Sequence, residues 1–139
     1  MTFLLDTNAI SEPGRVSADA GFSDWFDAAP ESELFLSVVT LGELRRGAAL
    51  LPLGARRTDL EATHQAILRQ FEHQVIPVDR TIALAWGELT AKHWRSGRRP
   101  SMSDELIAAT ALVHDLIVVT RNVVDFEAAG CKLLSPWSS

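Results

Sequence analysis

Five short apolar segments, each bounded by polar residues, are spread along the chain and predict β-strands. Most of them lack a regular alternation of apolar and polar positions, which is typical of strands buried on both faces of a parallel sheet. The predicted strands are residues 2–5 (TFLL), 34–37 (LFLS), 75–78 (VIPV), 116–120 (LIVVT) and 132–135 (KLLS).

Between these segments, apolar residues recur every three or four positions, which predicts amphipathic helices. The small residues Ala108, Ala109 and Ala111 would let the last of these helices lie close to a sheet. Because strands and helices alternate, we predict an α/β fold with an open, mainly parallel sheet and helices on both faces. The predicted helices are residues 40–51, 58–71, 81–94 and 104–115.

The composition fits one compact domain, because 139 residues with 47% hydrophobic and 22% charged content are typical of a globular protein. No linker or repeat divides the chain, so we predict a single domain over residues 1–139. No stretch approaches the roughly 20 apolar residues that cross a bilayer. The N-terminus also lacks a basic leader, so we expect a cytoplasmic protein without membrane contact. The single cysteine, Cys131, excludes an internal disulfide.

Four acidic residues occur where a parallel sheet of this kind would bind a ligand, at the carboxyl ends of the strands. Asp6 follows the first strand, and Asp125 follows the strand at residues 116–120. Glu43 and Asp104 lie in the first turns of two helices that we expect to begin at the same edge. The four side chains, although remote in sequence, could therefore meet in one cleft.

Each acid also has a local explanation. Residues 40–43 (TLGE) and 101–104 (SMSD) fit the capping box, in which the acid satisfies backbone donors at a helix N-terminus. Asp6 could close a turn, and Asp125 could cap a short helix. Four separate caps would have no reason to share one edge of a sheet, so the joint placement favours a common site.

A cluster of carboxylates needs a compensating cation, because neighbouring like charges raise one another's pKa. Oxygen ligands suit Mg²⁺ or Mn²⁺, which can activate a water molecule and stabilise charge on a phosphate. This chemistry points to hydrolysis of phosphodiester bonds. The net charge of −5 does not exclude a nucleic-acid substrate, because without the four carboxylates the rest of the chain carries only about −1.

Four sequence blocks occur in a fixed order: LLDTNAISE at 4–12, SVVTLGELRRG at 37–47, DELIAATAL at 104–112 and TRNVVDF at 120–126. Together they resemble the acidic signature of PIN-domain ribonucleases, and the whole chain resembles the VapC-type toxins of bacterial toxin–antitoxin pairs. The resemblance implies a three-layer α/β/α sandwich and a homodimer. It also implies a Mg²⁺-dependent endoribonuclease that cuts transfer or ribosomal RNA and is inhibited by a cognate VapB-like antitoxin.

By this resemblance, the invariant acids of the family fall on Asp6, Glu43 and Asp104. The fourth acid directly follows a TR pair in some relatives and stands in a DF pair in others. In this chain the first position is Asn122 and the second is Asp125. We predict Asp125 as the fourth carboxylate and Asn122 as a neutral ligand or water holder, and the sequence leaves open which of them takes that position.

Polar residues beside the acids would orient them, although they could equally be ordinary turn residues. Basic side chains must flank an anionic pocket that takes RNA. Alternatively, Arg98 and Arg99 belong to a solvated loop. Arg45 and Arg46 could instead contact an antitoxin. The orienting candidates are Thr7, Asn8 and Thr120, and the RNA-binding candidates are Arg45, Arg46, Arg98, Arg99 and Arg121.

Three other interpretations compete with a nuclease. A degenerate PIN-like module would bind RNA or protein without cleaving it, and the intact acids argue against this. An aspartyl-phosphate phosphatase needs a second acid two residues after Asp6, where Asn8 stands. A signalling receiver domain needs an Asp after its third strand and a later Lys, which the sequence does not supply. The sequence does not indicate which RNA is cut, whether one or two metals act, or which antitoxin is cognate.

Overall fold

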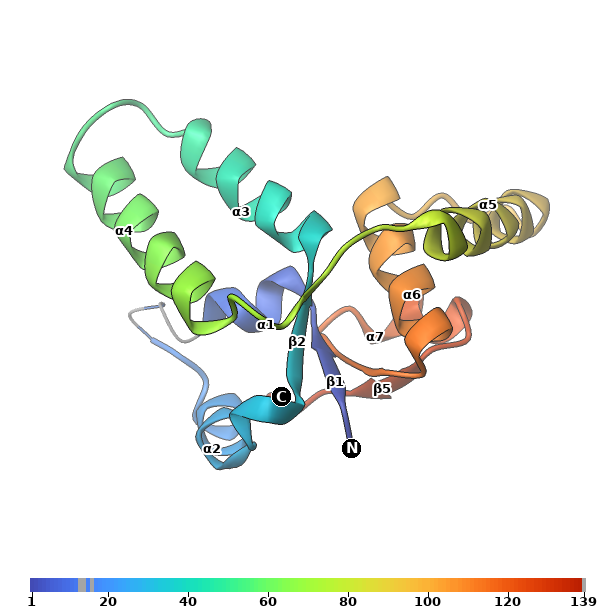
Figure 1. Cartoon of the computed structure of the whole chain (residues 1–139), viewed down its shortest axis with the longest axis horizontal. Coiled ribbons are helices and arrows are strands. Elements are labelled where there is room, and N and C mark those ends of the chain that lie inside the picture. The colour runs from blue at the N-terminus through green and yellow to red at the C-terminus, as the bar shows by residue number, and fades with distance from the viewer. Residues whose placement is uncertain (13–14, 16, 139) are drawn as a thin grey trace.

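A five-stranded sheet forms the centre of the computed structural model, which describes residues 1–12, 15 and 17–138 (Figure 1). The strand order is β3-β2-β1-β4-β5, and every neighbouring pair is parallel. The parallel sheet predicted from the apolar segments is therefore confirmed. The strands are β1 (Phe3–Leu5), β2 (Leu34–Ser37), β3 (Val75–Ile76), β4 (Ile117–Val119) and β5 (Lys132–Leu134).

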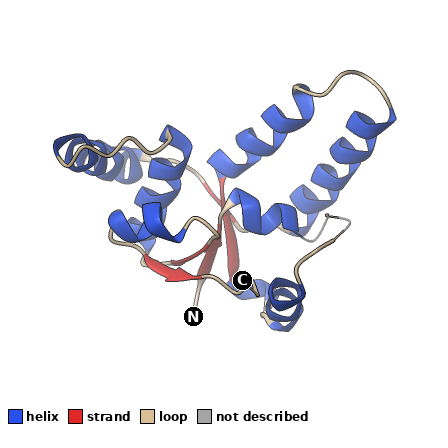
Figure 2. Ribbon diagram, turned by 180° about the vertical axis from the view of Figure 1, so that it is seen from behind, coloured by secondary structure: helices blue, strands red, loops and turns tan. Residues whose placement is uncertain are grey.

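Helices lie on both faces of the sheet, so the predicted three-layer α/β/α sandwich is confirmed (Figure 2). One face packs against α1 to α4, and the other packs against α5 to α7. The helices are α1 (Thr7–Ser11), α2 (Ala20–Ala28), α3 (Val38–Ala49), α4 (Ala55–Gln70), α5 (Arg80–Arg95), α6 (Met102–His114) and α7 (Val123–Ala128), and a short 3₁₀ helix, η2 (Glu31–Glu33), precedes β2.

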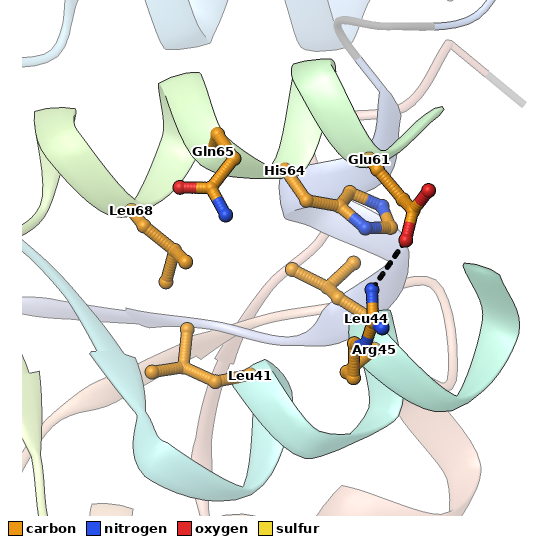
Figure 3. A pocket seen from close by; sticks show the side chains of 7 residues that line it. All are labelled: Leu41, Leu44, Arg45, Glu61, His64, Gln65 and Leu68. Atoms are coloured by element: carbon orange, nitrogen blue, oxygen red, sulfur yellow. Dashed lines mark hydrogen bonds and ion pairs between the residues drawn. The ribbon is translucent and has the colours of Figure 1, made fainter. Parts of the chain in front are cut away.

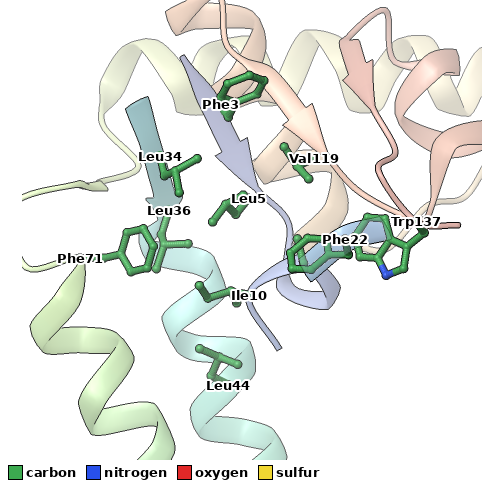
Figure 4. Close-up of a cluster of buried hydrophobic side chains, with 11 residues drawn as sticks. Phe3, Leu5, Ile10, Phe22, Leu34, Leu36, Leu44, Phe71, Val119 and Trp137 are labelled. Carbon is green, nitrogen blue, oxygen red and sulfur yellow. The ribbon is translucent and has the colours of Figure 1, made fainter. Parts of the chain in front are cut away.

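Aromatic side chains fill the core on the first face (Figure 4). Phe3 and Leu5 point to this face from β1 and pack with Phe22 of α2, which is fully buried. Phe22 stacks on Trp137, with the ring centroids 4.8 Å apart, and this contact holds the C-terminal segment against α2. Truncating a buried Phe of this kind to Ala costs about 3–5 kcal/mol.

The second core uses the opposite side of the same strands. Leu4, between Phe3 and Leu5, points to this face because successive side chains of a strand alternate, and it packs with Ile107 of α6 and Phe126 of α7. Small side chains on α6, among them Ala108, are buried against the sheet, as the sequence predicted. α6 is therefore fixed closely to the strand edge where the candidate acids occur.

The four predicted helices are present as α3, α4, α5 and α6, and each begins one to three residues earlier than predicted. The capping box proposed for residues 40–43 is wrong, because α3 begins at Val38 and the Ser37 hydroxyl accepts a hydrogen bond from the Val39 N–H at 3.1 Å. At residues 101–104, Ser101 is confirmed as the N-cap, since its hydroxyl accepts from the Asp104 N–H at 3.1 Å.

The longest described helices, α4 and α5, have 16 residues each; α5 buries Ile82, Leu89 and His93, whereas no residue of α4 is fully buried. In the part of the chain that the structure describes, no helix is both long enough and apolar enough to pass through a bilayer.

Candidate active site

Asp6 leaves the sheet at its carboxyl edge and is almost fully buried, with 3% of its surface exposed. Its carboxylate accepts hydrogen bonds from the Thr7 N–H (2.7 Å), Asn8 Nδ2 (3.0 Å) and the Thr120 hydroxyl (2.8 Å). The Thr120 contact follows from the register, because Leu5 pairs with Val119 and the next residues of both strands emerge side by side. Burial raises the pKa of Asp6 in spite of these three donors.

Glu43 reaches the same edge from the second turn of α3. Its Oε1 accepts a hydrogen bond of 2.5 Å from the hydroxyl of Thr7, the residue that follows Asp6. The negative charge of Glu43 also contributes to the raised pKa of Asp6. Thr7 therefore ties the carboxylate on α3 to the end of β1.

Asn122 joins the other two acids. Its Nδ2 donates to Asp104 Oδ2 at 3.3 Å and to Asp125 Oδ2 at 3.1 Å, while its backbone N–H donates to the Thr120 hydroxyl at 2.9 Å. Asp104 lies in the first turn of α6 and Asp125 in the first turn of α7. The cap proposed for Asp125 is wrong, because the N-cap of α7 is Asn122.

The negative charges of the other three acids act on Asp104. The pKa of Asp104 is raised to about 6, first by burial and then by the negative charges of Asp6, Glu43 and Asp125. Asp104 is half-buried in α6, far along the chain from the other segments. The structure therefore brings together the four acids that the sequence predicted at one sheet edge.

The acid cluster suits a metal ion by its chemistry but not by the spacing of its side chains. Over residues 1–12, 15 and 17–138, no three His, Cys, Asp or Glu side chains lie close enough together in this arrangement to hold an ion. The donor set does suit a hard divalent cation, because it consists of carboxylate oxygens whose mutual repulsion a cation would relieve. The Nδ2 group of Asn122 occupies the space between Asp104 and Asp125 and donates to both. Ion binding would therefore require the carboxylates to move closer together.

One of the expected basic residues, Arg98, lies near Asp125. Arg98 Nη1 is 4.0 Å from Asp125 Oδ1, so one guanidinium borders the acids directly. Arg99, the next residue, instead stacks on the ring of Trp94, with its Cζ 3.6 Å from the ring centroid. Arg46 is exposed on α3.

Arg45 lines a small pocket between α3 and α4 (Figure 3). The pocket has a volume of about 120 Å³, and Leu41, Leu44 and Leu68 provide its apolar lining. At one end, Arg45 Nη1 pairs with Glu61 Oε2 at 2.6 Å. Arg45 is therefore engaged with α4 in this structure.

Arg121 is held by a buried glutamate that the sequence analysis did not single out. Glu12, with 1% of its surface exposed, accepts a 2.6 Å hydrogen bond from Trp137 Nε1 and lies 3.8 Å from Arg121 Nη2. The Trp137 hydrogen bond is the main cause of the lowered pKa of Glu12. Its position at the end of the block LLDTNAISE is a signal in the sequence, but its partner Trp137 is 125 residues away. Glu12 thus anchors the loop before Asn122.

Fold and site together define an α/β protein with four carboxylates gathered at the carboxyl edge of a parallel sheet, the kind of site that suits metal-assisted phosphodiester chemistry. The model of the PIN domain family matches residues 3–130, and the chain belongs to this family.

Known relatives match nearly the whole chain. Plasmid stability protein StbB of Pseudomonas syringae pv. tomato is 42% identical over 137 residues, covering 98% of this chain and 99% of the relative. VapC ribonuclease Y4jK of Sinorhizobium fredii is 37% identical, covering 96% of each chain. The crystal structure of FitAcB from Neisseria gonorrhoeae superimposes with a TM-score of 0.90 at 35% identity, covering 99% of this chain and 100% of that one.

The predicted membership of the PIN-domain family, with VapC-type ribonuclease toxins as homologues, is confirmed, as is the assignment to the nuclease class of hydrolases. The phosphatase and receiver interpretations are excluded by the same family assignment.

Proposed function

We propose that this chain is the toxin of a toxin–antitoxin pair, a single PIN domain over residues 1–139 that hydrolyses RNA phosphodiester bonds in the cytoplasm with Mg²⁺, or with Mn²⁺ as a substitute. The observation that carries the proposal is the position of four carboxylates at one edge of the sheet, linked through Thr7, Thr120 and Asn122, where the negative charges of Asp6, Glu43 and Asp125 raise the pKa of Asp104. Such repulsion lowers the stability of the folded protein. A bound divalent cation would offset this repulsion among the carboxylates.

The carboxylates of Asp6, Glu43, Asp104 and Asp125 would hold the cation in this proposal. When bound, Mg²⁺ or Mn²⁺ lowers the pKa of a water molecule and offsets charge on the phosphate. We assign the fourth ligand position to Asp125, because the amide group that Asn122 turns toward the acids is the Nδ2 donor, which is not a metal ligand. Asn122 would then orient Asp104 and Asp125.

Neighbouring side chains would orient the remaining acids. The hydroxyl of Thr7 fixes Glu43, and Asn8 and the hydroxyl of Thr120 fix Asp6. Outside the carboxylates, Arg98 is placed to receive an RNA phosphate beside Asp125.

The test is cleavage of total RNA by the purified chain. We expect cleavage with Mg²⁺ or Mn²⁺, none with EDTA, and recovery when the metal is added back, with the cut sites mapped by end sequencing. By resemblance to the family, we expect a 5′-phosphate and a 3′-hydroxyl at each cut, the ends that form when water attacks the phosphorus and the 3′-oxygen leaves. RNA binding without cleavage under both metals would instead favour the degenerate PIN-like module.

The antitoxin is the second part of the proposal. Similar chains occur in the solved structures of FitAB bound to a DNA fragment, of DNA-bound VapBC from Salmonella typhimurium, and of VapBC-5 from Mycobacterium tuberculosis, a member of the VapBC family of toxin–antitoxin systems. By this likeness we propose a cognate VapB-like antitoxin as the partner of this chain. The leucine-lined pocket between α3 and α4 supports a contact with an apolar side chain of such a partner. A homodimer, implied by the same resemblance, stays a prediction.

Leu68→Glu should weaken antitoxin binding about 10- to 100-fold, because it places a charge in the apolar pocket. RNA cleavage should remain, since Leu68 lies outside the acid cluster. The measurement is calorimetric titration with the cognate antitoxin. Leu53→Glu is the matched control, because Leu53 is 87% exposed in the loop between α3 and α4. If both variants bind the antitoxin as tightly as the wild type, the pocket is not part of the antitoxin interface.

A further inference from the structure

Trp94 is an exposed aromatic residue at the end of α5. Its surface is 66% exposed, although the tryptophans at positions 25, 86 and 137 are half-buried or buried. The guanidinium of Arg99 covers part of the indole at 3.6 Å from the ring centroid. The rest of the indole faces solvent, so an apolar ring remains available to a ligand.

The loop after α5 is built to hold this pair. The Arg98 N–H donates to the His93 carbonyl at 2.9 Å and the Gly97 N–H to the Trp94 carbonyl at 3.2 Å, the two bonds of a Schellman motif. Gly97 has a φ of +78°, which favours glycine. The chain then turns back, and Arg99 Nη1 donates to the carbonyls of Trp94 (3.3 Å) and Arg98 (2.7 Å). The guanidinium is therefore fixed over the indole.

Two contacts tie the stack to the acid cluster. Arg98, which precedes Arg99, lies 4.0 Å from Asp125. His93, which precedes Trp94, is joined to Glu105, the neighbour of Asp104, by a buried hydrogen bond of 2.8 Å between Nδ1 and Oε2. Figure 1 shows α5 and α6 side by side. The segment that carries Trp94 and Arg99 is therefore joined to Asp125 through Arg98 and to α6 through His93.

We propose that Trp94 is a stacking platform for an unpaired RNA base next to the scissile phosphate. This inference rests on the proposed ribonuclease function. Single-stranded RNA presents bases that stack on aromatic rings and on guanidinium planes, and phosphates that bind arginine. The Trp94 and Arg99 stack offers the first kind of contact, and Arg98 offers the second beside Asp125. The platform therefore selects RNA that is unpaired at the cleavage site, such as a loop.

Trp94→Ala should raise KM about 10-fold for a short single-stranded RNA that the wild type cuts at one site, with kcat nearly unchanged. Trp94→Phe should recover most of the affinity, because a phenyl ring also stacks. Leu50→Ala is the matched control, since Leu50 is a large apolar residue that is 73% exposed at the end of α3. This control should leave KM and kcat as in the wild type.

A second measurement detects the stacking of an RNA base on Trp94 directly. 2-Aminopurine placed beside the cut site should lose fluorescence when the RNA binds the inactive Asp104→Asn protein with Mg²⁺. The quenching should disappear in the Asp104→Asn, Trp94→Ala double variant.

Three outcomes distinguish a failure of the Trp94 platform, a role of Trp94 in a dimer interface and a failure of the proposed ribonuclease function. If the wild type cuts RNA and Trp94→Ala has the same KM, the platform is wrong and the proposed function stands. If light scattering shows that Trp94→Ala converts a dimer to a monomer, the residue belongs to an interface with a second copy and the platform is again wrong. If the wild type cuts no RNA with either metal, the proposed function itself fails.

Discussion

An Asp104→Asn variant should lose RNA cleavage about 10³-fold and yet be more stable than the wild type in the absence of metal. The loss follows from removing one carboxylate that would hold the cation, which is worth about 4 kcal/mol of transition-state stabilisation. The gain follows from removing a charge that three neighbouring carboxylates repel. The opposite signs of the two effects separate a functional acid from a structural one.

The pH dependence of the stability gain has a definite direction. The pKa of Asp104 is raised to about 6 in the folded protein, from its ordinary value of 3.8. Between these two values the folded state binds more protons than the unfolded state, so its stability falls as pH rises. The penalty is absent below about pH 4 and complete above about pH 6. The variant should therefore have the higher Tm at pH 8 in EDTA, and both proteins should have similar Tm values near pH 4.

Thermal unfolding with and without metal completes this test. Mg²⁺ should raise the Tm of the wild type and have little effect on Asp104→Asn. Asp24→Asn, at an exposed position of α2, is the matched control and should change neither cleavage nor Tm. A lower Tm for Asp104→Asn than for the wild type at pH 8 would contradict the repulsion among the four acids.

The main elements of the fold could be predicted because their patterns are long and regular. The helices α3 to α6 contain at least three full turns, enough for apolar periodicity to appear. Shorter helices carry too little pattern: α1 has 5 residues and α7 has 6. The start of α3 was misplaced because Val38 and Val39, β-branched residues typical of strands, follow directly after β2.

The candidate acids could be predicted because their positions depend on topology alone. Each follows a strand or begins a helix at the same edge, and parallel strands bring those positions together. The hydrogen bonds among them depend on side-chain placement in three dimensions. No spacing in the sequence indicates that Asn122 donates to both Asp104 and Asp125, or that Glu12 meets Trp137 across the length of the chain.

Thr120→Val should raise the metal concentration that gives half-maximal cleavage about 10- to 100-fold. Thr120 is fully buried at the end of β4, where its hydroxyl donates to Asp6 at 2.8 Å and accepts from the Asn122 N–H at 2.9 Å. Valine has nearly the same shape and lacks both hydrogen bonds. Asp6 and Asn122 would each lose a partner, and the two halves of the acid cluster would no longer be linked.

The same substitution should lower the free energy of unfolding by about 1–3 kcal/mol, because buried polar groups lose their partners. Thr110→Val controls for this loss, since Thr110 is equally buried and its hydroxyl bonds only to the Leu106 carbonyl within α6. Urea denaturation measures the stability of both variants, and cleavage titrated with Mg²⁺ measures the metal requirement. If the two variants have the same metal requirement as the wild type, Thr120 supports the fold alone. If Thr120→Val raises the metal requirement and Thr110→Val does not, the Thr120 hydroxyl positions Asp6 for the cation.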